Sequence, residues 1–449
     1  VHDFGSLVVS MRAQGMSIGK VTEGIIGARA MTLFHLIIFC GVALAMGVFV
    51  YVIAVRFSIS DRWDPGEPMA DPASFPTAVF PSAALIVIAM AMGYLLYKKK
   101  FPLLPATVVG FVLMMMAVWG GVKWPLLWMD RASWPGQATW IIILLIYSFV
   151  ASVLPVWSLL QARDFLNSLM LYLGLALSYL GIFVWRPEVA APVFRAHPEG
   201  APSFYPCVFI IIACGAASGF HSLVASGTTA KQIDKETDAR FIGYGGMVGE
   251  SLLGLLAVLA CTAGVLGTGG YSAAEVWAQN YHDWGSMQSL GNQVGVFITG
   301  AAQFIEKLGF VSHKVATAFI AVVVVSFALT TLDSATRLLR FNISEMGETV
   351  KIRALDNRFV SSILAVLVIA FFAFYKIGGK PAGLALWRLF GTTNQLLAGL
   401  ALLAVSLYLY QRGKNPWFTA VPMLFMAVST ILAMFSNLRD FYAQWEEGG

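Results

Sequence analysis

The sequence predicts an all-α fold, a polytopic bundle of about eleven membrane-spanning helices, and two observations lead to it. The first is composition: of 449 residues, 58% are hydrophobic and only 12% are charged, with a mean hydropathy of +0.75. Soluble domains carry roughly 25% charged residues, so this chain cannot cover a water-soluble particle of its size. The second is a series of long apolar runs, most of them near the roughly 20 residues that cross a hydrocarbon core about 30 Å thick. The bilayer is therefore the expected solvent.

The apolar runs are predicted to be helices because they do not alternate polar with apolar residues, as barrel strands do. They cover residues 31–51, 77–97, 101–122, 138–160, 165–185, 204–229, 241–266, 315–339, 360–375, 384–410 and 417–435. We expect one transmembrane domain over residues 1–449, made of a basic segment (1–30), a helical bundle (31–438) and an external tail (439–449).

Several function classes lack support in the sequence. The net charge of +5 is modest, and no basic run is interleaved with aromatic residues, so nucleic acid is not an expected partner. Walker A, GxGxxG, GxSxG and HExxH motifs are missing, so we expect no enzyme, no cofactor and no metal. Four cysteines lie within apolar runs without CxxC spacing and are expected to pack as small apolar residues: Cys40, Cys207, Cys214 and Cys261.

Basic residues gather in alternate loops and predict the orientation. Loops with a basic excess follow the second, fourth, sixth, eighth and tenth spans and include Lys98 to Lys100, Arg163, Lys231, Arg337, Arg340 and Arg412. The loops of the other side, 58–75, 186–203 and 267–303, are longer or rich in Pro and Asp. The first group is thus predicted to be cytoplasmic, in a bacterial inner membrane with the C-terminus outside.

The chain begins with Val1, and residues 1–9 look like the tail of an earlier helix that enters the basic segment. We therefore expect that a front part of the protein precedes this sequence.

The sixth apolar run contains a small, polar, glycine-interrupted stretch. Its candidate binding residues are Ser218, Gly219, Phe220, His221, Ser222, Thr228 and Thr229. One interpretation is a broken helix that lines a ligand site, because transporters bind substrate where helices break near the midplane. The other is a close helix–helix contact whose hydroxyls bond to carbonyls one turn earlier. Both stay open at this point.

The tenth run contains a second such stretch, from Phe390 and Gly391 to Asn394 and Gln395. Two adjacent amides inside a span need hydrogen-bond partners. The sequence predicts a second helix break here, either for binding or for interhelical bonding.

Isolated carboxylates inside spans are expensive and therefore suggest function. Glu250 lies in the seventh run and Asp333 in the eighth. Glu250 and His221 are candidate proton carriers, since both can be neutral or charged. Asp333 with the hydroxyls of Ser334 and Thr336 suits a hard cation such as sodium. Alternatively, Asp333 forms a simple i,i+4 ion pair with Arg337.

These stretches together resemble the carbon starvation protein A (CstA) family. The resemblance rests on Ser218 to Ser222, on Ser226 to Thr229, on the Phe241 to Glu250 stretch, on residues 154–164, on Asp333 to Arg337 and on residues 390–399. It implies an amino acid–polyamine–organocation or LeuT-like fold with inverted repeats and broken helices. It also implies a symporter for proton-coupled uptake of pyruvate or short peptides.

The resemblance is incomplete at the start of the chain, because family members carry a Gly- and Pro-rich broken helix upstream of the part that matches Asp3 and Phe4. Half of a binding site would then lie outside this sequence. The leading hypothesis is secondary transport of a small organic metabolite, coupled to a proton or a sodium ion, in contact with membrane lipids. The alternative is an accessory or structural subunit of a larger membrane complex, bound to partner subunits and built on an incomplete transporter scaffold.

Overall fold

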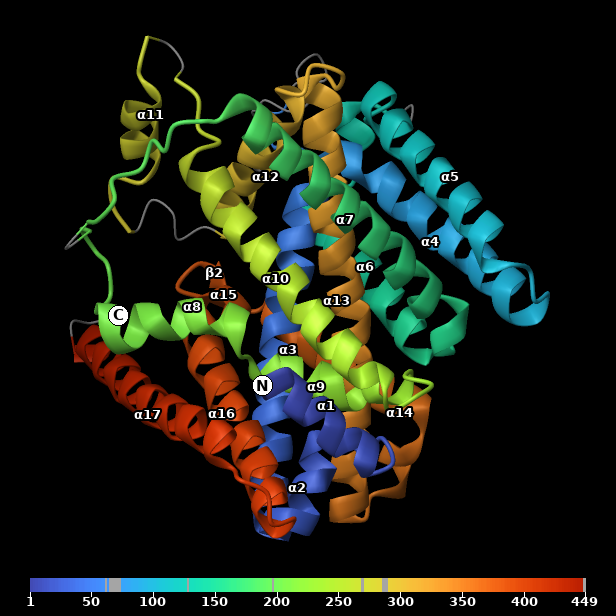
Figure 1. The fold of residues 1–449 in the computed structure, drawn as a ribbon, viewed down its shortest axis with the longest axis vertical. Helices are drawn as coiled ribbons and strands as arrows, with labels where there is room; N and C mark the ends of the chain where they lie inside the picture. The colour runs from blue at the N-terminus through green and yellow to red at the C-terminus, as the bar shows by residue number, and fades with distance from the viewer. Residues whose placement is uncertain are drawn as a thin grey trace. The chain divides into compact units, whose positions relative to one another are not determined.

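The structure is a computed structural model that describes residues 1–60, 63, 74–126, 129–195, 198–267, 270–284 and 290–446. Within these ranges the regular secondary structure is helical, apart from a two-residue antiparallel pair, β1 (Lys376–Ile377) and β2 (Lys380–Pro381), and one isolated bridge (Figure 1). Nine helices of the described residues are long and apolar enough to cross a membrane. The predicted all-α class is confirmed.

The chain divides into two compact units, and the first comprises Val1–Val48, Pro202–Gly249 and Ser334–Gly449. In this unit α16 and α17 pack along each other, and α9 packs against α1 and α16 (Figure 1). Its helices are α1 (His2–Arg12), α2 (Ile18–Ile26), α8 (Phe209–Ala216), α9 (Gly219–Gly227), α14 (Arg358–Phe374), α15 (Ala382–Ala385), α16 (Trp387–Gln411) and α17 (Trp417–Glu446).

The second unit comprises Phe49–Ala201 and Glu250–Asp333. Here α4 packs against α5 and α7, and α12 packs against α7. Its helices are α4 (Val79–Gly93), α5 (Leu103–Lys123), α6 (Gln137–Val153), α7 (Leu160–Trp185), α11 (Ala273–Asn280) and α12 (Leu290–Glu306). Three helices run from one unit into the other without interruption: α3 (Ala28–Phe57), α10 (Asp238–Thr262) and α13 (His313–Val350).

Every predicted apolar run contains a helix, but the bounds differ where proline intervenes. The run 138–160 was expected to be one span, whereas α6 ends at Val153. Pro155 disfavours helical backbone at the residue before it, and Leu154 is accordingly extended. α6 and α14 are apolar helices of 17 residues each, shorter than the nine candidate spans.

The segment 267–303 is not the long loop that the sequence suggested. It contains α11, which begins with a capping box between Ser272 and Glu275, and most of α12. Parts of this segment, of 58–75 and of 186–203 lie outside the described residues.

Three arginines that were predicted to lie in cytoplasmic loops lie in helices instead. Arg163 lies in α7 and is 1% exposed, and Arg337 and Arg340 lie in α13 at 5% and 8%. α13 has 38 residues, so at about 1.5 Å per residue it extends about 57 Å, far beyond the hydrocarbon core. These buried arginines are therefore not loop charges that indicate orientation. Lys98 to Lys100 are exposed, at and after the end of the π-helical turn Tyr94–Lys98 that follows α4.

The two ends of the chain are more helical than expected. α1 agrees with the predicted helix tail, but α2 makes a second helix within the basic segment 1–30. α17 continues to Glu446, through most of the predicted external tail, and residues 447–449 lie outside the described part.

Candidate functional site

The sixth apolar run is a broken helix, as predicted. α8 ends at Ala216 and α9 begins at Gly219, and the two residues between them are extended: Ala217 has φ −148° and ψ 106°, and Ser218 has φ −126° and ψ 140°. The break lies at the start of the predicted stretch, since Gly219, Phe220, His221 and Ser222 are already helical. Such an interruption frees backbone groups that a continuous helix would pair internally.

Asn394 of α16 holds the two halves of this helix together. Its Nδ2 donates to Cys214 Sγ of α8 (3.2 Å) and to Ser218 Oγ in the break (2.9 Å). Its Oδ1 accepts from the backbone N–H of Phe220 in α9 (2.9 Å). Ser218 Oγ also accepts from that N–H at 3.1 Å and thus caps α9. Cys214 is therefore a hydrogen-bond acceptor as well as a packing residue.

Gly219 lies where α9 comes closest to α16. A Cβ atom built there would be 2.4 Å from Leu397 Cβ and 2.5 Å from the Asn394 carbonyl oxygen. The break and the close small-residue contact, two interpretations left open by the sequence, thus occur together. A cavity of about 10 Å³ beside the break, lined by Gly41, Phe220, Phe390 and Asn394 among others, has room for about one water molecule.

The hydroxyls of α9 are used mainly within the protein. Ser222 Oγ donates to the Gly219 carbonyl at 2.7 Å, and Ser226 Oγ donates to the Ser222 carbonyl at 2.7 Å. Thr228 is the C-cap of α9, and Thr229 begins a short 3₁₀ turn, Thr229–Lys231. These bonds favour the packing interpretation for the serines of α9.

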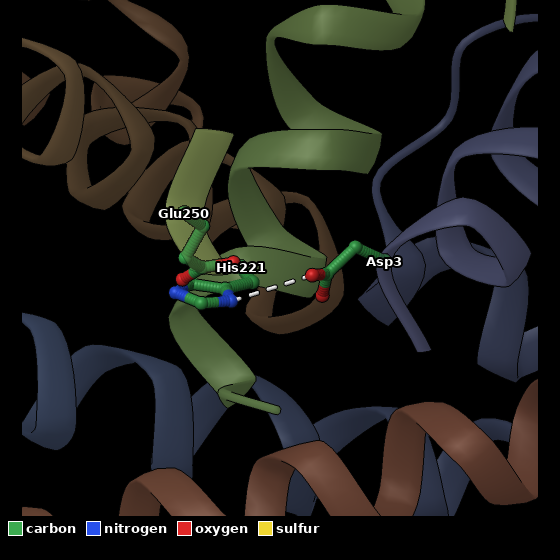
Figure 2. Close-up of side chains that lie close together, drawn as sticks. All are labelled: Asp3, His221 and Glu250. Carbon is green, nitrogen blue, oxygen red and sulfur yellow. Dashed lines mark ion pairs between the residues drawn. The ribbon is translucent and has the colours of Figure 1, made fainter. Parts of the chain in front are cut away.

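His221 of α9 forms an ion pair with Asp3 of α1. The distance between His221 Nδ1 and Asp3 Oδ2 is 3.4 Å. Figure 2 shows the two side chains facing one another. Both are partly exposed, at 28% and 37%. The other oxygen of Asp3 lies 2.6 Å from His2 Nδ1. The first helix of the chain therefore supplies an acidic partner to the broken helix.

The predicted second break, at residues 390–395, is wrong. α16 is continuous from Trp387 to Gln411. The hydroxyls of Thr392 and Thr393 donate to backbone carbonyls three and four residues earlier in the same helix. A single glycine destabilises a helix by only about 1 kcal/mol relative to alanine. The amides differ in use: Asn394 bonds to the broken helix, whereas the buried Gln395 amide has no hydrogen-bond partner in the described part of the chain.

Asp333 lies in a buried polar cluster of the second unit. Its Oδ2 accepts hydrogen bonds from Arg163 Nη1 of α7 and from Tyr147 OH of α6, the latter at 2.6 Å. Asp333 and Arg163 are 0% and 1% exposed. Asp333 therefore has a buried long-range partner in Arg163, which its i,i+4 spacing to Arg337 did not suggest.

The remaining predicted site residues lie on α13 and α10. Ser334 and the fully buried Thr336 follow Asp333 on α13, and Glu250 lies on α10 at the first position of the second unit. Tyr147 and Arg163 were missed as site candidates. The signal for Arg163 was its place in the 154–164 stretch, but its charge looked like an ordinary loop charge.

The second unit also contains a cavity of about 550 Å³. This volume is in the range of small-molecule sites. The lining is mostly apolar, and its polar members include Arg56, Gln293 and Thr331. Arg56 is the charged side chain among the described lining residues.

Comparison with known proteins agrees with this set of features. A model of the family described as "Carbon starvation protein CstA" matches residues 1–433. The chain belongs to the CstA family.

Curated CstA-family relatives are named as transporters and not as enzymes. The chain is 28% identical to "Peptide transporter CstA" of Campylobacter jejuni, over 100% of this chain and 67% of the relative. It is 30% identical to the protein of the same name from Mycobacterium tuberculosis, over 98% and 62%. It is 28% identical to "Pyruvate/proton symporter BtsT" of Escherichia coli, over 99% and 69%. The chain thus spans 62% to 69% of the length of these relatives.

Asn394→Ala is expected to destabilise this CstA-family protein by about 1–3 kcal/mol, because the Phe220 N–H and Ser218 hydroxyl lose a buried partner. Thermal unfolding in detergent measures the effect. Gln395→Met is the matched control on the same helix: it removes a buried amide that has no partner in the described residues, so stability should hold or rise. Equal losses in the two variants would contradict the role of Asn394.

Proposed function

We propose that this chain forms the main part of a proton-coupled secondary transporter that takes up pyruvate or short peptides. Membership of a family whose curated relatives are peptide transporters and a pyruvate/proton symporter supports this function. The observation that carries it is the interruption of α8 and α9 at Ala217 and Ser218, inside an apolar candidate span. An unwound stretch at that depth is typical of a substrate or ion site.

The proposed architecture has eleven spans in this chain, with the LeuT-like inverted repeat that the resemblance implies. Nine long helices and two apolar helices of 17 residues, counted over the described residues, are consistent with this number. The inner membrane of a bacterium is the proposed location.

The proposed substrates share a carboxylate, since pyruvate and every free peptide carry one. The cavity of about 550 Å³ offers enough volume for such a molecule, and Arg56 gives its wall a permanent positive charge. Its largely apolar lining would contact the methyl group of pyruvate or the side chains of a peptide.

Uptake of labelled pyruvate and of labelled di- and tripeptides tests the proposal. The protein is expressed from its full coding region in cells that lack their own pyruvate and peptide uptake. We expect accumulation of one substrate class that a protonophore abolishes. No uptake of either class, with the protein recovered instead in a stable complex with other membrane proteins, would favour the accessory-subunit alternative.

His221 and Glu250 are the proposed proton-carrying groups, since imidazole and a carboxyl can both change charge at accessible pH. Glu250→Gln is expected to retain substrate binding while uptake loses its dependence on the pH gradient. Counterflow, which needs no gradient, measures the retained binding and exchange. Proton-driven accumulation at wild-type rates in both Glu250→Gln and His221→Gln would rule these groups out.

The proposed orientation predicts the outcome of cysteine-accessibility labelling. Single cysteines in 98–100 and in 231–240 should react only with reagent on the cytoplasmic side, and cysteines in 186–195 only from outside. The C-terminal residue should also label from outside. Reversed labelling of the two basic loops would overturn the orientation.

A further inference from the structure

The ion pair between Arg163 and Asp333 bears on which ion drives this protein. The two side chains come from different helices, α7 and α13, which both qualify as membrane spans. They are 1% and 0% exposed. Tyr147 OH contacts the same carboxylate oxygen at 2.6 Å.

A sodium ion held by Asp333, Ser334 and Thr336 would depend chiefly on the carboxylate, because hard cations are bound by negatively charged and carbonyl oxygens. In this structure Asp333 Oδ2 already carries a positive partner, the guanidinium of Arg163. Unlike a lysine ammonium, a guanidinium is not deprotonated in proteins, so its charge is permanent. A second cation beside it would meet direct repulsion in a region of low dielectric.

We infer that Arg163 is a built-in cation that excludes sodium from Asp333 and so leaves the proton as the coupling ion. As a statement about coupling, this inference rests on the proposed transport function. Arg163 is thus a residue that determines ion specificity by charge compensation, without itself contacting the substrate.

The surroundings of Arg163 differ from those of a purely structural ion pair. Most buried side-chain polar atoms have at least one hydrogen-bond partner. Here Arg163 Nε and Nη2 and both amide atoms of Asn167, one turn further along α7, have no hydrogen-bond partner among the described residues. Removal of the guanidinium would therefore leave a polar space beside Asp333, with the Tyr147 hydroxyl near it, that suits a hydrated cation.

The test measures sodium binding by thermal unfolding, so it needs no transport. The purified full-length protein is heated in NaCl and, at equal ionic strength, in KCl. The wild-type protein should unfold at the same temperature in both salts. Arg163→Ala should unfold at a lower temperature than wild type in KCl and gain about 2 °C or more in NaCl. Arg163→Lys, which keeps a cation, should show no such gain.

Two controls make the outcome specific. Arg163→Ala/Asp333→Asn should lose the sodium response, because the carboxylate is gone. Arg56→Ala removes another buried arginine of the same unit, stacked on Phe75, and should not acquire the response. If Arg163→Ala does not fold in either salt, Arg163→Gln takes its place.

The inference would be overturned if sodium stabilised the wild-type protein and Asp333→Asn removed that stabilisation. It would also be overturned if sodium stabilised neither Arg163→Ala nor Arg163→Gln. If the wild-type protein showed no uptake in the cell assay, this would contradict the transport function. It would not change the result of the sodium-binding experiment. The two proposals can therefore fail separately.

Discussion

Asp333→Asn is expected to lower the free energy of unfolding by about 3–5 kcal/mol, because it leaves the buried Arg163 guanidinium without its counter-charge. Thermal or chemical unfolding of the purified protein in detergent measures this loss. The double variant Asp333→Asn/Arg163→Met should be more stable than the single one, since removal of a whole buried ion pair is often nearly neutral.

Asp164→Asn is the matched control for this experiment. Asp164 is 47% exposed and lies 3.9 Å from Arg163 Nη2, so its loss should cost less than about 1 kcal/mol. Equal stability of the single and the double Asp333 variants would show that the pair is not the source of the effect.

Gly219→Ala is expected to reduce stability by about 1–3 kcal/mol and to abolish uptake. The added methyl group would lie 2.4 Å from Leu397 Cβ and 2.5 Å from the Asn394 carbonyl oxygen, so α9 has to move away from α16. That movement pulls the Phe220 N–H away from the Asn394 side chain and disturbs the break itself. Thermal unfolding and uptake rate are measured on the same preparations.

Gly391→Ala provides the control on the facing helix. Apart from the adjacent residues and backbone of α16, no atom of the described residues lies within 4 Å of a Cβ built at Gly391. Alanine also favours helix over glycine by about 1 kcal/mol. Its stability should hold or rise. If Gly219→Ala behaves in the same way, the close approach of α9 to α16 is not essential.

Local sequence information predicted the features that depend on local chemistry. Long apolar runs predicted the helical class, and the small polar residues around Ser218 predicted the break between α8 and α9. The same reasoning failed at Gly391, because hydroxyls that can bond to their own helix do not interrupt it. It also failed at α12, where an amphipathic helix lies within a segment that looked like a loop.

Features that depend on contacts distant in sequence were not accessible in this way. The spacing of Asp333 suggested an ion pair with Arg337, four residues later. The structure shows a buried partner in the same unit, Arg163, which lies 170 residues earlier. The hydrogen bonds of Asn394 to the broken helix likewise depend on the packing of α16 beside it, which the sequence does not reveal. Among thirteen candidate positions, Ser218, Phe220 and Asn394 form one hydrogen-bonded group, and the role of each in transport remains a prediction.

The far end of α9 offers a way to observe its motion from a distance. Ser10 Oγ of α1 lies within hydrogen-bond distance of the carbonyls of Ser226 (3.0 Å) and Met16 (2.7 Å), and the N–H of Ile18 donates to Ser226 Oγ (3.1 Å). The turn between α1 and α2 is thus fastened to α9 and has to follow it or release these bonds. Met16 is 44% exposed. A fluorophore attached there would report displacement of the broken helix in real time, without any modification of the residues around the break.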